Sequence, residues 1–157
     1  MEIALVSIGK ISTPWIKNGV AEFENRISRY IKFISKEIPD LKRAASLSNE
    51  KIKEMEGDLI LNELSTSDLT VLLDEKGKEF TSREFADWIQ KQMGSGRKRL
   101  VFVIGGPFGF SQKVYDRADF KVALSKLTFT HEMAKLFFCE QIYRSMTIIK
   151  GEPYHHD

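Results

Sequence analysis

At 157 residues the chain has the length of one domain. Its composition, with 42% hydrophobic and 29% charged residues, is ordinary for a folded globular protein. Its longest apolar runs fall short of the roughly 20 residues that a membrane-spanning helix needs, and residues 1–10 do not have the layout of a signal peptide. We therefore expect a single domain over residues 1–157, in the cytoplasm and without a membrane partner. The single cysteine, Cys139, excludes an intrachain disulfide and a cysteine-based zinc cluster, and its place in an apolar helix pattern predicts a buried thiol.

The net charge of +2 is small but unevenly distributed. Residues 1–94 carry 14 Lys and Arg against 16 Asp and Glu, whereas residues 95–157 carry 10 against 6. A basic half can face the phosphates of a nucleic acid, although a solvated surface with interspersed acids has the same composition.

The first half of the chain predicts alternating strands and helices. The apolar pattern of Glu2–Ile8 is that of a strand, and a Thr-Pro pair at 13–14 marks the start of a helix. Apolar residues at helical spacing continue that helix as far as Ile34, while residues 33–38 also fit a second strand. A polar connection then leads to a helix over residues 49–64.

The middle of the chain repeats this alternation. Leu69–Leu73 predicts a third strand, with residues 74–78 as a loop at its carboxyl end. Thr81 and Glu84 have the spacing of a capping box, so a helix follows them. The continuous apolar run Leu100–Ile104 predicts a strand buried on both faces, which is typical of parallel sheets covered by helices.

A glycine-rich loop, Gly105–Gly109, follows this strand, and Ser111 then has the character of a helix N-cap. In open α/β sheets such junctions bind ligands at the carboxyl ends of the strands. The loop lacks both the Lys-Ser/Thr ending of a phosphate-binding P-loop and the spacing of the dinucleotide fingerprint. A plain tight turn remains the alternative.

The last part of the chain predicts a short strand over residues 121–124, a loop over 125–129, and a long helix from Thr130 to about Lys150, ended by Gly151. This helix is apolar on two sides, so one side can pack on the sheet and the other on a second copy of the chain. The elements together predict an α/β fold, a single domain with a mainly parallel sheet flanked by helices. Three loops should converge at the carboxyl edge of that sheet. The three histidines lack a zinc-site spacing, so we expect no metal.

Four stretches carry distinctive motifs: Val103–Gly109 (VIGGPFG), Leu124–His131 (LSKLTFTH), Glu140–Arg144 (EQIYR) and Pro153–His155 (PYH). Together they resemble the ribosomal RNA large subunit methyltransferase H family, which belongs to the SPOUT class of α/β-knot methyltransferases. The resemblance covers the whole chain. It implies a trefoil knot in the C-terminal half, a homodimer, and S-adenosylmethionine-dependent methylation of N3 of a pseudouridine in the 23S rRNA of an assembled ribosome.

The resemblance also implies site residues. The cofactor pocket would comprise Leu73, Gly105, Leu124, Ser125, Lys126, Leu127, Thr128 and Phe129. A role in the core is the alternative for Leu127 and Phe129. Near the acceptor base, Arg144 would hold a phosphate or developing negative charge, Tyr154 would contact the base, and His155 would relay a proton. Packing of the last helix against the tail is the alternative role for Arg144 and Tyr154.

Two positions depart from the family pattern, in which proline often stands at position 130 and arginine at position 135. Thr130 can still cap a helix, whereas Lys135 keeps the charge but loses the bidentate fork, which makes a phosphate contact there less secure. A different class of function also fits the same fold, namely a non-catalytic ribosome-binding or assembly factor. The intact glycine loop and the Tyr154-His155 tail favour the enzyme.

Overall fold

The structure is a computed structural model that describes residues 1–42 and 44–156. Five parallel strands form one sheet in the order β2-β1-β4-β3-β5. The strands are β1 (Glu2–Ile8), β2 (Lys32–Ile38), β3 (Leu69–Lys78), β4 (Arg99–Ile104) and β5 (Phe120–Val122). Because all the pairings are parallel, the carboxyl ends of the strands lie at one edge, where the predicted loops are expected to meet.

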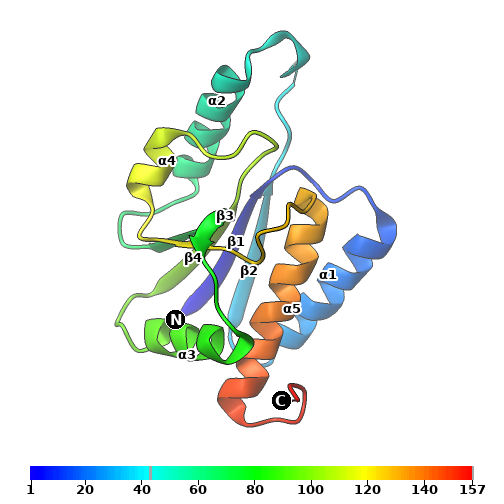
Figure 1. The fold of residues 1–157 in the computed structure, drawn as a ribbon, viewed down its shortest axis with the longest axis vertical. Helices are drawn as coiled ribbons and strands as arrows, with labels where there is room; N and C mark the ends of the chain where they lie inside the picture. The colour runs from blue at the N-terminus through cyan, green and yellow to red at the C-terminus, as the bar shows by residue number, and fades with distance from the viewer. Residues whose placement is uncertain (43, 157) are drawn as a thin grey trace.

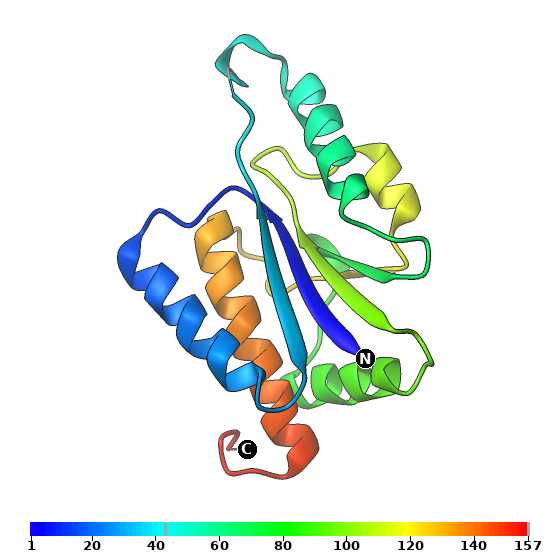
Figure 2. The same ribbon diagram turned by 180° about the vertical axis from the view of Figure 1, so that it is seen from behind.

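Helices cover both faces of the sheet (Figures 1 and 2). One face carries α1 (Pro14–Ile27), α3 (Ser82–Met93) and α5 (His131–Lys150), and the other carries α2 (Asn49–Asn62) and α4 (Gln112–Arg117). A short 3-10 helix, Ala44–Ser46, precedes α2. This is the doubly covered α/β sheet that the sequence predicts.

Strand β4 lies at the centre of the sheet and is buried on both sides. Leu100 and Phe102 pack into the core under α1, α3 and α5, whereas Val101 and Val103 pack into the core under α2 and α4. All four side chains are fully buried. An unbroken apolar run is what two such cores require, so the sequence-based prediction for this strand is confirmed.

The first helix is shorter than its apolar periodicity predicts. It ends at Ile27, and a turn closed by the bond from the Tyr30 N–H to the Ile27 carbonyl leads into β2. Ile34 pairs with Ala4 of β1 and is therefore a strand residue, so its assignment to the helix stripe is wrong. The competing prediction of a strand at 33–38 is confirmed, because pairing with β1 satisfies the backbone over this segment.

Residues 74–78 are also assigned differently from the prediction. They continue β3 instead of forming a plain loop, and the ladder between β3 and β5 shifts register between Leu73 and Lys78. Gly77 makes this possible, because a Cβ atom there would lie 2.5 Å from the backbone nitrogen of Val122. The irregularity bends the end of β3 and leaves Asp74 and Glu75 outside the regular ladder.

Both ends of α5 follow the sequence-based prediction. The Thr130 hydroxyl accepts a hydrogen bond from the Met133 N–H at 3.3 Å, and Gly151 ends the helix in the left-handed conformation with φ of 68°. One face of α5 buries Phe138 and Ile142 against the sheet, while Phe137 on another face is 40% exposed. The helix is thus apolar on a side that one chain leaves partly uncovered.

Residues 123–130 cross the carboxyl edge of the sheet between β5 and the start of α5 (Figure 1). The resemblance to the SPOUT class implies a trefoil knot in the C-terminal half of the chain, which includes this segment. None of the helices over residues 1–42 and 44–156 has both the length and the apolar character of a membrane span.

Candidate active site

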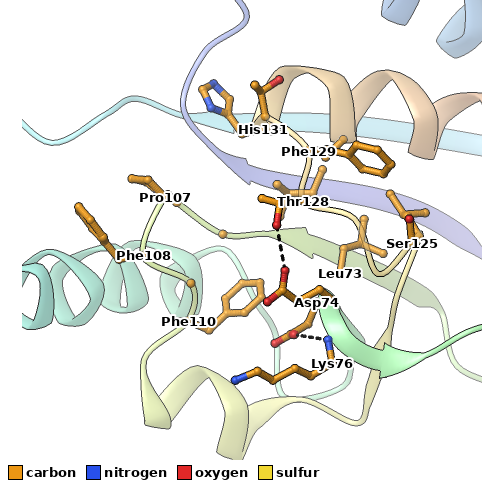
Figure 3. A pocket seen from close by; sticks show the side chains of 18 of the residues that line it. Leu73, Asp74, Lys76, Pro107, Phe108, Phe110, Ser125, Thr128, Phe129 and His131 are labelled. Carbon is orange, nitrogen blue, oxygen red and sulfur yellow. Dashed lines mark hydrogen bonds between the residues drawn. The ribbon is translucent and has the colours of Figure 1, made fainter.

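The carboxyl ends of β3, β4 and β5 open onto one cavity of about 900 Å³ (Figure 3). Three segments supply most of its lining, namely residues 73–76, 104–110 and 124–131. Figure 3 shows Phe108 on one side of this space and Ser125 and Phe129 on the other. The convergence of three strand-end loops, predicted from the sequence, is therefore confirmed.

Most of the expected cofactor residues lie around this cavity. Those lining it are Leu73, Gly105, Leu124, Ser125, Leu127, Thr128 and Phe129. Lys126 differs, because its side chain is 79% exposed and its Nζ atom lies 3.3 Å from a carboxylate oxygen of Glu79. The Lys126 side chain thus points away from the space that its neighbours surround, and only its main chain shares their loop.

The glycine loop is held in shape by its own backbone. The Gly109 N–H donates to the Gly106 carbonyl at 3.1 Å, and Gly109 has a φ of 81°, which favours glycine. At Gly105 a Cβ atom would lie 2.9 Å from the ring of Phe110. Close packing of that ring is therefore a structural reason for glycine at 105, in addition to the approach of a ligand.

The loop over residues 124–129 is fixed by side-chain hydrogen bonds. The Leu127 N–H donates to the Ser125 hydroxyl at 3.0 Å, and the Thr128 hydroxyl donates to Glu75 at 3.3 Å, which joins this loop to the end of β3. The Leu127 side chain is 74% exposed, so the alternative of a core role for it is wrong. Phe129 packs against Phe137 with ring centroids 4.9 Å apart.

A polar pair on the cavity wall was not singled out from the sequence. The Tyr115 hydroxyl donates to Asp74 Oδ2 at 2.5 Å, and the Lys76 N–H donates to Asp74 Oδ1 at 2.8 Å. Burial, followed by the bond to Asp74, raises the pKa of Tyr115 to about 12, so the phenol stays protonated at neutral pH. In the described parts of the chain, no cluster of three or more His, Cys, Asp or Glu side chains could hold a metal ion.

Lys135, at one of the two positions that depart from the family pattern, is not available to a phosphate. Its side chain is 1% exposed, and Nζ donates to the Gly9 carbonyl at 2.5 Å and to Glu37 at 3.0 Å. Nearby, the Ser12 N–H donates to Glu132 at 2.6 Å. Lys135 therefore joins the start of α5 to the ends of β1 and β2, in agreement with the expectation that a phosphate contact there is less secure.

The three expected acceptor-side residues gather at the other end of α5. Arg144 Nη1 lies 3.3 Å from His155 Nδ1, and the Arg144 guanidinium lies 4.8 Å from the centre of the Tyr154 ring. Glu140, one turn earlier on α5, accepts hydrogen bonds from Arg144 and, at 3.1 Å, from the Tyr154 hydroxyl. The structure thus adds Glu140 to this group, and its spacing of four residues from Arg144 in the EQIYR motif is the signal in the sequence that could have identified it.

Within one chain this tail cluster, defined as Glu140, Arg144, Tyr154 and His155, is far from the cavity. Ala134 is the cavity-lining residue furthest along α5, and Arg144 lies 10 residues beyond it. A rise of 1.5 Å per residue places them roughly 15 Å apart along the helix axis. Figure 1 shows the C-terminus beside the end of α5 that is remote from the crossing loop.

Comparison with known proteins relates this chain to a family of methyltransferases. The family model described as "Predicted SPOUT methyltransferase" matches residues 1–155. Two relatives named "Ribosomal RNA large subunit methyltransferase H" match along their whole length: one from Christiangramia forsetii is 52% identical over 156 residues, covering 99% of each chain, and one from Parabacteroides distasonis is 51% identical over 157 residues, covering 100% of each. A solved structure described as a probable methylase family protein from Haemophilus influenzae Rd KW20 has a TM-score of 0.54 at 11% identity, over 99% of this chain and 70% of that one, and shows likeness of fold alone.

The SPOUT family model matches the chain almost end to end, and the parallel sheet directs three loops into one cavity. The chain is therefore a SPOUT-class methyltransferase. The class alone leaves the family open. Identity at half of all positions over the full length decides it, and the chain belongs to the ribosomal RNA large subunit methyltransferase H family. The family resemblance found in the sequence is thereby confirmed.

Proposed function

We propose that this protein transfers a methyl group from S-adenosylmethionine to N3 of a pseudouridine in 23S rRNA, on the ribosome in the cytoplasm, and that it acts as a homodimer. The observation that carries the proposal is the three-loop cavity in a chain that is about half identical, over its full length, to relatives named for methylation of large-subunit rRNA.

The cavity fits the cofactor in size and chemistry. Its volume of about 900 Å³ lies within the usual range for small-molecule sites. Leu73, Leu124 and Leu127 offer apolar surface to an adenine ring, and the exposed Leu127 side chain would lose contact with water on binding it. When bound, S-adenosylmethionine supplies an electrophilic methyl group on a positively charged sulfur.

The tail cluster supplies what the acceptor needs. N3 of the base must lose its proton as it accepts the methyl group, so the site has to stabilise negative charge and receive a proton. Arg144 offers the positive charge, Tyr154 a hydroxyl and an aromatic face, and His155 a group that can relay the proton. Glu140 contacts both Arg144 and Tyr154, which makes it a positioning residue for the pair.

The distance between cavity and tail cluster supports a homodimer. A separation of roughly 15 Å along α5 is too long for direct methyl transfer between the cavity and the tail cluster of one chain. A second copy could bring its own tail to the cavity by packing on the partly exposed side of α5 that carries Phe137. Each active site would then combine the cavity of one subunit with the tail of its partner.

Subunit mixing tests this arrangement. One variant, Ser125→Trp, fills the cavity and keeps the tail, while the other, Y154A/H155A, keeps the cavity and loses the tail. Each should be inactive alone, and cofactor binding should survive only in the second. After unfolding and refolding as an equal mixture, half of the dimers are mixed, and each mixed dimer holds one complete site built from both subunits.

Shared sites therefore predict recovery of about one quarter of the wild-type activity, because half of the dimers are mixed and only one of the two sites in each mixed dimer is complete. Sites built within single subunits predict no recovery, since every site in a mixed dimer would lack either its cavity or its tail. A mixture that stays inactive, with mixed dimers demonstrated by mass spectrometry, would overturn the shared arrangement.

A further inference from the structure

We propose that Asp74, held by Tyr115, makes the cavity distinguish the positively charged cofactor S-adenosylmethionine from its product S-adenosylhomocysteine, whose sulfur is neutral. This inference rests on the proposed function, because it assumes that the cavity binds this cofactor. It adds a selectivity residue to the cavity, from a pair that joins the end of β3 to α4.

Asp74 stands at the point where β3 leaves its regular pairing, and its side chain is half-buried in the cavity wall. Tyr115 Oη lies 2.5 Å from Oδ2, and the Lys76 N–H lies 2.8 Å from Oδ1. A carboxylate can accept about four hydrogen bonds, so these two donors leave acceptor positions for a ligand. Figure 3 shows Asp74 beside Leu73, below the loop that carries Thr128.

The donors that hold Asp74 are neutral, a phenol and a peptide N–H, and they orient the carboxylate without cancelling its charge. Of the other charged side chains of the wall, Lys53 lies 2.6 Å from Glu50, and Glu75 accepts a hydrogen bond from Thr128 at the junction of the two loops. Lys76, whose N–H holds Asp74, also lines the cavity with its side chain. Asp74 differs from these residues in that a donor on each of its two oxygens fixes the carboxylate in place on the cavity wall.

Tyr115 is suited to hold this carboxylate in place. Its ring packs edge-on against Phe110 at a centroid distance of 5.7 Å, and Lys121 Nζ lies 5.7 Å from the ring centre. A tyrosine hydroxyl is protonated at neutral pH, and burial with the bond to Asp74 raises the pKa of Tyr115 further, to about 12, so the hydroxyl stays a donor. Phe110 also packs behind Gly105, so the same aromatic pair supports both the glycine loop and Asp74.

A fixed negative charge discriminates between the two ligands because they differ by one positive charge. Both carry an amino-acid ammonium group, but only the cofactor carries a sulfonium. In a cavity that partly excludes water, a carboxylate several ångströms from the sulfonium favours the charged ligand by about tenfold in affinity. Loss of the methyl group removes that attraction, which promotes release of the product.

Isothermal titration calorimetry with three probes tests this directly. The probes are S-adenosylmethionine, S-adenosylhomocysteine, and sinefungin, in which an amine-bearing carbon replaces the sulfonium and restores a positive charge. Asp74→Asn keeps the shape of the side chain and removes its charge, and Tyr115→Phe removes only the hydroxyl that holds it. Asp116→Asn is the matched control. Asp116 lies on α4 beside Tyr115, but on the exposed side of that helix and outside the cavity lining, so the substitution removes one negative charge away from the cavity.

With Asp74→Asn, the affinities for S-adenosylmethionine and sinefungin should fall about tenfold while that for S-adenosylhomocysteine changes less than twofold. Tyr115→Phe should reduce the discrimination by a smaller factor, and Asp116→Asn should leave it unchanged. Thermal unfolding of each variant shows that it is folded.

Equal losses for all three ligands in Asp74→Asn would place the carboxylate at the ammonium group that they share and would overturn the inference. So would an unchanged affinity ratio, or the same change in Asp116→Asn. A wild-type protein that binds none of the three ligands would instead contradict the proposed function itself.

Discussion

The contact between Gly106 of the glycine loop and Glu56 of α2 leads to a prediction about stability. Glu56 is 5% exposed, and its Oε2 atom has no hydrogen-bond partner among the described residues. A Cβ atom at position 106 would lie 2.3 Å from Oε2 and 2.5 Å from Oε1. Gly106→Ala therefore forces the buried carboxylate to move by more than 1 Å to reach an ordinary van der Waals distance.

Overpacking of this kind costs about 1–3 kcal/mol of unfolding free energy. For a chain of this length, each kcal/mol corresponds to a change of about 2–4 °C in Tm, so Gly106→Ala should lower Tm by about 2–12 °C. Because the cost arises from the carboxylate, Glu56→Ala should remove most of it by vacating the space. The two substitutions should be coupled by at least about 1 kcal/mol.

Urea unfolding of the wild type, both single variants and the double variant measures this coupling. We expect the double variant to be clearly more stable than the sum of the two single effects predicts. If Gly106→Ala costs the same with and without Glu56, within about 0.5 kcal/mol, the contact does not explain glycine at this position.

Four further predictions concern the core and the two ends of α5. Phe138→Ala should lower the unfolding free energy by about 3–5 kcal/mol in urea, because this fully buried ring packs 4.7 Å from that of Phe102; a cost under 1 kcal/mol would contradict that packing. Cys139 is fully buried and its pKa is raised by burial, so it should resist a thiol reagent in the native protein and react after unfolding. Hydrogen bonds, the largest effect coming from the Ser12 N–H, lower the pKa of Glu132 to about 2. The ionised Glu132 therefore stabilises the fold fully above its ordinary pKa of 4.5, and this stabilisation is lost as the pH falls from 4.5 towards 2. Glu132→Gln should flatten the acid limb of a Tm-against-pH profile between these two pH values. Arg144→Ala should lower the methyl-transfer rate at least about 100-fold with less than a twofold change in cofactor affinity, and parallel losses in both would place Arg144 at the cofactor instead.

The sequence allowed the strands and most helix ends to be predicted, because local chemistry determines them. The apolar run of β4, the capping box of Thr81 and Glu84, and Gly151 at the end of α5 each act through neighbouring residues, and each is found in the structure. The end of α1 could not be predicted in this way. Ile34 fits the helical spacing, and only pairing with Ala4 of β1, distant in the chain, makes it a strand residue.

The candidate site was predictable to the extent that it depends on motifs. The three loops follow strands that the sequence reveals, and parallel pairing brings their ends together. The contact between Tyr115 and Asp74 joins residues 41 positions apart, so it depends on where α4 packs, which local patterns do not specify. The family resemblance implies that Arg144 and the cavity serve one reaction. The length of α5 separates them in one chain, and that separation is visible only in three dimensions.

The most direct test of the proposed function is incubation of the pure protein with radiolabelled S-adenosylmethionine and ribosomes from cells that lack the endogenous enzyme, followed by mapping of the labelled nucleotide. We predict label on N3 of a single pseudouridine in 23S rRNA. Label on another nucleotide would contradict the proposed acceptor. No label, with cofactor binding shown separately, would contradict the enzyme and favour a ribosome-binding factor of the same fold.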